Sequence, residues 1–202
     1  MNTRKISELT TSLQERLDPV DQAPILIDEI EGKHPHAKKS AILVPIFVYK
    51  GEISLIFIRR ASTLRTHSGE IAFPGGKTDP EDSSPKMTAL REMQEELGIA
   101  PERVDVLGLL KPVFTVVSNY LITPVVGFLP EGPGTFKVQP GEVAELIIIP
   151  LQTLQDPAIF HTEQWTRAEV SRTIYFYNYG NYRIWGATGR ILHSLLQHLP
   201  TK

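Results

Sequence analysis

The chain has no cysteine among its 202 residues. Disulfide bonds, thiolate zinc sites and a cysteine nucleophile are therefore excluded, and any metal must be held by oxygen or histidine ligands. Long hydrophobic runs are absent as well. The longest covers residues 41–49 and contains Pro45, whereas a membrane-spanning helix needs about 20 apolar residues. We expect a soluble cytoplasmic protein with no membrane partner.

The sequence also lacks an excess of either charge. Lys and Arg total 21 and Asp and Glu total 23, which gives a formal net charge of −2. A broad basic surface is therefore excluded, nucleic acid is not an expected partner, and any polyanion site must be local. The hydrophobic share of 41% and the charged share of 22% are ordinary for a globular protein.

Residues 1–39 differ in pattern from the rest of the chain. Leu9, Leu13 and Leu17 recur every four positions, which predicts a short amphipathic helix. A polar, proline-containing stretch follows, and its basic run at residues 33–39 is either a solvated segment or a phosphate-binding patch. We interpret residues 1–39 as a helical arm with a linker, and residues 40–202 as the main domain.

The main domain mixes strand and helix patterns. β-rich runs cover residues 41–49, 53–58, 104–110, 121–129 and 145–151, and helical patterns cover residues 84–97 and 186–199. Hairpin turns are expected around Gly51 and around residues 132–134. Because the helices are few and far apart, the order of elements favours an α+β fold with a mixed sheet over a doubly wound parallel sheet.

The segment over residues 84–97 has explicit helix start and stop signals. Ser84 suits the N-cap, Pro85 suits the first helical position, and Gly98 suits a left-handed C-terminal residue. At 100° per residue, the apolar side chains gather on one face of this helix. The opposite face is acidic.

Three glutamates, Glu92, Glu95 and Glu96, form that acidic face. Like charges three and four positions apart destabilise a helix, so we expect a positive partner. Carboxylates converging in this way suit Mg²⁺ or Mn²⁺, and the glycines Gly75 and Gly76 would let backbone approach a ligand closely. A solvated acidic helix face is the alternative interpretation.

At these residues the sequence resembles the Nudix hydrolases. Their signature is glycine, five residues, glutamate, seven residues, and then Arg-Glu-aliphatic-x-Glu-Glu-x-Gly-aliphatic, which residues 91–99 match in full. The first half departs from the signature, because Asp82 replaces the glutamate and eight residues separate it from Arg91. The resemblance implies an α/β/α sandwich and metal-dependent hydrolysis of a pyrophosphate bond in a nucleoside diphosphate derivative.

Residues 60–76 extend the resemblance to one branch. They look like the additional signature of the coenzyme A pyrophosphatases, Arg-Ser/Ala, three residues, Arg, three residues, Gly, three residues, Phe-Pro-Gly-Gly, although the usual residues before the first arginine are not kept. This resemblance implies cleavage of coenzyme A or acyl-CoA to 3′,5′-ADP and (acyl-)4′-phosphopantetheine. A Nudix pyrophosphatase for ADP-ribose, NADH or dinucleoside polyphosphates and a non-catalytic nucleotide-binding module are the alternatives. A homodimer is possible by the same resemblance.

Candidate site residues follow from the motifs and the resemblance together. The metal ligands would be Glu92, Glu95, Glu96 and the Gly75 carbonyl, and the catalytic residues Glu92, Glu95, Glu96, Glu145 and Arg91, with Arg91 orienting carboxylates. The proton of the attacking water could go to Glu95, to Glu96 or to an acid in residues 141–145, where Glu142 and Glu145 are equally compatible with ordinary strand-edge charges. Substrate phosphates would contact Arg60, Arg65, His67 and Lys77. The two arginines could instead pair with Glu70 or a helix carboxylate, and His67 could have no role.

Overall fold

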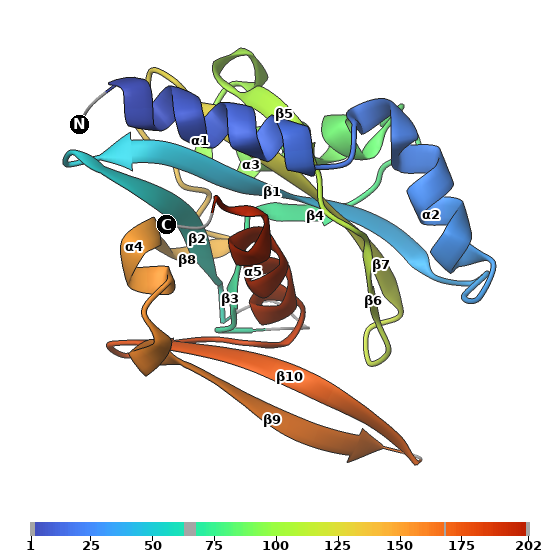
Figure 1. Ribbon diagram of the computed structural model, residues 1–202. Coiled ribbons are helices and arrows are strands. Elements are labelled where there is room, and N and C mark those ends of the chain that lie inside the picture. Colours follow the sequence, from blue (N-terminus) through green and yellow to red (C-terminus); the bar gives the residue numbers. More distant parts are fainter. Residues whose placement is uncertain (1–2, 63–67, 168, 201–202) are drawn as a thin grey trace.

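A mixed β-sheet runs through the middle of the protein (Figure 1). The computed structural model describes residues 3–62, 68–167 and 169–200. The sheet contains β1 (Lys38–Tyr49), β2 (Glu52–Arg60), β3 (Ile71–Ala72), β4 (Gly75–Lys77), β5 (Asp105–Leu109), β6 (Val113–Thr115), β7 (Tyr120–Leu129) and β8 (Val143–Pro150). Central β1 runs antiparallel to β2 and β4 and parallel to β7, so the predicted mixed sheet and the β1–β2 hairpin are confirmed.

Helices cover both faces of this sheet. They are α1 (Thr3–Arg16), α2 (Ala23–Glu31), α3 (Pro85–Leu97), α4 (Leu151–Leu154) and α5 (Gly186–His198), with short 3₁₀ turns η1 (Val20–Gln22), η2 (Pro101–Arg103) and η3 (Pro157–Ile159). Leucines of α1, α4 and α5 share one buried cluster, whereas the apolar face of α3 belongs to a second cluster. The result is the α/β/α sandwich that the resemblance to the Nudix hydrolases implies.

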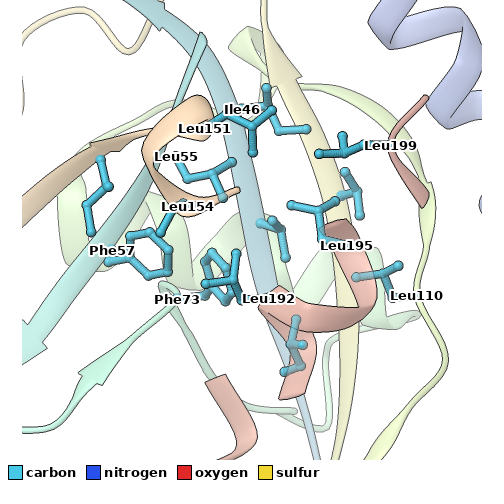
Figure 2. Packing of buried hydrophobic residues seen from close by; sticks show 14 of the residues in the cluster. Ile46, Leu55, Phe57, Phe73, Leu110, Leu151, Leu154, Leu192, Leu195 and Leu199 are labelled. Atoms are coloured by element: carbon cyan, nitrogen blue, oxygen red, sulfur yellow. The ribbon is translucent and has the colours of Figure 1, made fainter. Parts of the chain in front are cut away.

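Strand β2 shows why two layers of helices are needed. Leu55 and Phe57 point into the cluster under α4 and α5, and Ile56 and Ile58 point into the cluster under α3. All four side chains are fully buried because successive residues of a strand face opposite sides of the sheet. Figure 2 shows the first cluster, in which Leu192 and Leu195 of α5 pack among the side chains of the sheet.

The N-terminal residues pack onto this core. Leu9 and Leu13 of α1 are buried, which confirms the amphipathic helix, and Asp18 exchanges backbone hydrogen bonds of 3.0 and 2.8 Å with Leu109 of β5. The stretch interpreted as a polar linker contains a helix, α2, after Pro19. The boundary between arm and domain near residue 39 stays a prediction.

A smaller antiparallel sheet was not predicted. It contains β9 (Phe160–Arg167), β10 (Val170–Tyr179) and β11 (Tyr182–Ile184), and it projects below the main body in Figure 1. The expected hairpin around residues 132–134 is wrong: β7 pairs with β1, β5 and β6, and β8 crosses over to pair with β2. No helix among the described residues is both long and apolar enough to cross a membrane.

Candidate active site: a carboxylate cluster beside two glycines

Helix α3 begins and ends where its capping residues predict. The Ser84 hydroxyl accepts a hydrogen bond of 3.3 Å from the Met87 N–H, and Pro85 is the first helical residue. Gly98 ends the helix with φ at 70°, a left-handed conformation that glycine adopts without steric cost. Since Met93 and Leu97 anchor the opposite face in the core, the orientation of the glutamates is set by packing.

Two glycines bring the backbone of β4 against this acidic face. A Cβ at Gly76 would lie 2.4 Å from the Cδ of Glu92, so the carboxylate occupies the space that any larger residue would fill. Gly75 has φ at 150°, and a Cβ there would lie 2.5 Å from the Ala41 carbonyl oxygen. The Gly75 N–H donates a 2.9 Å hydrogen bond to Oε2 of Glu96. The glycine pair therefore holds both carboxylates close to the sheet.

A third carboxylate reaches the same place from a distant loop. The N–H groups of Lys137 and Gln139 donate to the carbonyls of Leu97 and Glu96, two of the backbone acceptors that the end of α3 leaves open. This docking carries Glu142 to the helix. Glu92, Glu96 and Glu142 each offer one carboxylate oxygen, and these oxygens lie within 4.8 Å of one another.

Burial and the neighbouring acids disfavour the charged forms of Glu92 and Glu96. Glu96 is only 1% exposed, and burial raises its pKa to about 8, with the charges of Glu92 and Glu142 acting in the same direction. Burial also raises the pKa of Glu92, although the neighbouring Arg91 opposes this shift. A divalent cation would relieve this repulsion, and a set of carboxylate oxygens is the donor chemistry that Mg²⁺ and Mn²⁺ prefer. The residues present therefore fit such an ion.

Arg91 is the positive partner that the glutamates require. Its guanidinium donates to both carboxylate oxygens of Asp82, at 3.2 and 2.9 Å, to Glu92 at 3.0 Å and to Glu95 at 2.9 Å. It also donates to the Lys77 carbonyl at 3.0 Å. Arg91 thus ties the loop before α3 to the helix. Glu95 is held in this ion pair, outside the group formed by Glu92, Glu96 and Glu142.

The structure places Glu145 elsewhere. Its carboxylate accepts hydrogen bonds from the Tyr182 hydroxyl at 2.6 Å and from Arg59 at 2.8 Å, and these two contacts lower its pKa. A register shift between Arg59 and Arg60 leaves one additional residue in β8, so Glu145 pairs with Arg59 and Val143 with Arg60. Val143 therefore faces the cluster under α3, whereas Glu145 shares the face of Ile147, under α4 and α5. Glu142 is the acid of this segment that meets the helix.

The predicted cationic residues lie at the edges of the site. The charge of Arg60 acts on Glu96, and the backbone of Arg60 bonds to Glu70 and Gly69 across the base of the following loop. Lys77 follows the two glycines on β4, with its side chain exposed. Arg65 and His67 lie outside the described residues.

Fold and site together define a class of protein. An α/β/α sandwich that presents clustered carboxylates beside a glycine turn is suited to hydrolysing phosphate compounds with a bound divalent cation.

Comparisons with known proteins agree with this class and narrow it. The family model described as "NUDIX domain" matches residues 37–170. The chain is 40% identical over 162 residues to "Uncharacterized Nudix hydrolase NudL" of Photorhabdus laumondii subsp. laumondii, which covers 80% of this chain and 85% of that protein. A NudL protein of Yersinia pestis (strain Pestoides F) is equally identical over the same length, with 80% of each chain covered.

Solved structures share the fold. The "MutT/nudix family protein from Enterococcus faecalis" has a TM-score of 0.51 at 14% identity, covering 85% of this chain and 68% of that one.

The chain belongs to the Nudix family. It is a Nudix hydrolase, an enzyme class that cleaves the pyrophosphate bond of nucleoside diphosphate derivatives and generally uses divalent metals such as Mg²⁺ or Mn²⁺.

Proposed function

We propose that this enzyme hydrolyses coenzyme A or acyl-CoA to 3′,5′-ADP and (acyl-)4′-phosphopantetheine. The observation that carries the proposal is the run over residues 60–76, which resembles the coenzyme A pyrophosphatase signature and leads directly into the carboxylate site. Its first arginine, Arg60, lies close enough to influence the charge of Glu96.

Glu92 and Glu96 are the proposed metal ligands. Both carboxylates are held against the glycine turn, and both gain from a bound cation because burial disfavours their negative charge. Bound there, Mg²⁺ or Mn²⁺ would neutralise diphosphate oxygens and make a coordinated water more acidic. Arg91 positions Glu92 through its hydrogen bond and fixes the loop through Asp82.

Glu142 is the proposed acceptor of the water proton. It is the exposed member of the group, and its carboxylate faces the site where the attacking water would be generated. The water oxygen forms a bond to one phosphorus, the bond from that phosphorus to the bridging oxygen breaks, and the other phosphate leaves with the bridging oxygen. Glu145 is unsuited to this step because Tyr182 and Arg59 already bind its carboxylate.

Guanidinium and ammonium groups at the edge of the site would hold the remaining phosphate charge. Arg60 and Lys77 flank the glycine turn, and Arg65 and His67 belong to the same signature run. All three glutamate positions of the helix part of the signature are glutamate in this chain. This argues against a module that binds a nucleotide without cleaving it. The family resemblance also supports a homodimer, which size-exclusion chromatography with light scattering would test.

The direct test is a substrate panel with product identification. Purified enzyme is incubated with coenzyme A, ADP-ribose, NADH and a dinucleoside polyphosphate, each with Mg²⁺ or Mn²⁺, and the products are identified by chromatography and mass. We expect preferential release of 3′,5′-ADP from coenzyme A. Faster cleavage of another diphosphate would refute coenzyme A as the substrate but would not contradict the proposed metal site.

Matched variants test the residue roles on the cleaved substrate. Glu142→Gln is expected to lower kcat by about 10²-fold, the scale of general base catalysis, whereas Glu145→Gln is expected to retain activity close to that of the wild type. The opposite ranking of these two variants would overturn the assignment of the base. Wild-type rates in Glu92→Gln and Glu96→Gln would overturn the assignment of these two residues as metal ligands.

A further inference from the structure

A distant segment of the chain packs directly against Gly98, the residue that caps α3. A Cβ at Gly98 would lie 2.6 Å from the Cβ of Lys137, and 3.2 and 3.3 Å from the backbone N and Cα of that residue. Atoms in contact prefer about 3.5 Å or more. The left-handed turn alone does not require glycine, because asparagine also occurs at such caps. Gly98 therefore meets a steric demand as well as a conformational one.

Backbone hydrogen bonds on both sides of this contact fix the segment. The Lys137 N–H donates to the Leu97 carbonyl at 2.9 Å. The Gln139 N–H donates to the Glu96 carbonyl, also at 2.9 Å. The apolar residues before and after Lys137 pack against the cluster under α3. A side chain at position 98 would therefore shift the segment rather than release it.

The same segment leads into Glu142. The Gln139 carbonyl accepts hydrogen bonds from the N–H groups of Glu142, at 3.1 Å, and Val143, at 2.9 Å, so a tight turn joins the docked segment to the acid. The Glu142 carbonyl in turn accepts from the Ala61 N–H at 2.8 Å. Because these bonds join backbone to backbone, a movement of residues 137–139 is passed on to Glu142.

We infer that Gly98 is a positioning residue for Glu142. By having no side chain, Gly98 lets residues 137–139 dock closely enough to bring the Glu142 carboxylate to Glu92 and Glu96. A Cβ at position 98 displaces the segment by about 1 Å, the difference between 2.6 Å and an ordinary contact. The inference rests on the proposed function, in which Glu142 accepts the proton of the attacking water.

Gly98→Ala and Gly132→Ala form a matched pair in the full-length protein. Both glycines have φ at 70°, so the added Cβ imposes the same backbone strain at both positions, but at Gly132 it meets nothing within 4 Å. We expect Gly98→Ala to lower kcat about tenfold or more with KM nearly unchanged, and Gly132→Ala to keep the wild-type kcat. Thermal unfolding verifies that both variants are folded. Equal kcat in the two variants would overturn the inference.

Removing the obstructing atom tests the steric cause. Lys137→Gly deletes the Cβ that lies closest to position 98, so the double variant Gly98→Ala/Lys137→Gly is expected to recover most of the lost kcat. The Lys137 side chain is exposed, and Lys137→Gly alone should turn over close to the wild-type rate. Absence of any recovery in the double variant would contradict a steric cause.

A double-mutant cycle with Glu142 separates this inference from the proposed function. In the Glu142→Gln background, Gly98→Ala is expected to lower kcat by less than about twofold, because coupled residues do not act additively. The full tenfold loss in that background would show that Gly98 acts through another group, and only the inference would fall. A wild-type rate in Glu142→Gln itself would refute the proposed proton acceptor, and the inference with it.

Amide chemical shifts give a readout that does not depend on turnover. In ¹⁵N-labelled protein, the signals of residues 139–143 are expected to shift in Gly98→Ala and to stay in place in Gly132→Ala. Unchanged signals of residues 139–143 in Gly98→Ala would refute the transmission of the contact to Glu142.

Discussion

Replacing Gly76 by alanine is expected to change the geometry of the site while leaving the stability of the fold nearly unchanged. The added Cβ would lie 2.4 Å from Cδ and Oε1 of Glu92, whereas carbon atoms in contact prefer about 3.5 Å or more. The Glu92 carboxylate must therefore retreat by about 1 Å. It is the end of a flexible side chain, so this movement costs the folded state little.

The consequence for catalysis is much larger. A displacement of about 1 Å at a reacting centre can cost about 10²-fold in rate, which corresponds to about 2.7 kcal/mol of transition-state stabilisation. We expect Gly76→Ala to lower kcat by about that factor and to need more Mg²⁺ for half-maximal activity. Its midpoint of thermal unfolding should stay within a few degrees of the wild type. Steady-state kinetics across a metal titration, combined with calorimetry, measures both quantities.

The matched comparison is Gly75→Ala, which we expect to lower the stability of the fold. Its Cβ would meet the backbone of Ala41 and Ile42 at 2.5 Å, and φ at 150° is a region that costs other residues about 1–3 kcal/mol. Neither backbone can move freely inside the sheet, so the midpoint should fall clearly. Wild-type turnover in Gly76→Ala, or equal loss of stability in both variants, would refute the reasoning.

Three further predictions concern stability. Leu13→Ala should lower the free energy of unfolding, measured with urea, by about 2–5 kcal/mol, since Leu13 is fully buried in the core. A decrease of less than about 1 kcal/mol would show that the N-terminal arm contributes little to stability. Tyr182→Phe should lower the midpoint of thermal unfolding only slightly, because the hydrogen bond to Glu145 that it removes is exposed to solvent, and turnover should be retained; a large loss of turnover would contradict the structural role of this pair. The bond from Arg91 lowers the pKa of Asp82 to about 2, below its unfolded value of 3.8. Asp82 therefore stabilises the fold above pH 4, by about 2 kcal/mol, and this contribution is lost as the pH falls toward 2. The stability difference between wild type and Asp82→Asn should accordingly narrow between pH 5 and 3, and a constant difference would exclude this linkage.

Local signals in the sequence predicted helix α3 well. Ser84, Pro85 and Gly98 act only on the backbone within one turn, so their effect does not depend on the rest of the fold. The apolar and acidic faces follow from the helical period alone, and the expected cation proved to be Arg91 on the same helix. Strand positions were also predictable, because β1 and β2 carry continuous apolar runs.

Long-range pairing was not predictable from the same patterns. The turn at residues 132–134 looks like a hairpin, but β8 pairs with β2, which is about 90 positions earlier in the chain. The small sheet was missed although β10 contains three tyrosines together with Val, Thr, Ile and Phe, which are typical strand residues. Its alternation of Ile174 and Phe176 with tyrosines was an available signal.

The sequence by itself determined the acidic helix, its caps, the glycine turn and the class of chemistry, because each depends on residues close together in the chain. Only the tertiary structure decided which distant acid completes the site. Glu142 and Glu145 are three positions apart and equivalent by composition, yet docking of residues 137–139 on the end of α3 brings Glu142 to the helix. Glu145 lies on the same face of β8 as Ile147, where it meets Arg59 and Tyr182. Such choices depend on strand register and loop closure, which arise from contacts between segments far apart in sequence.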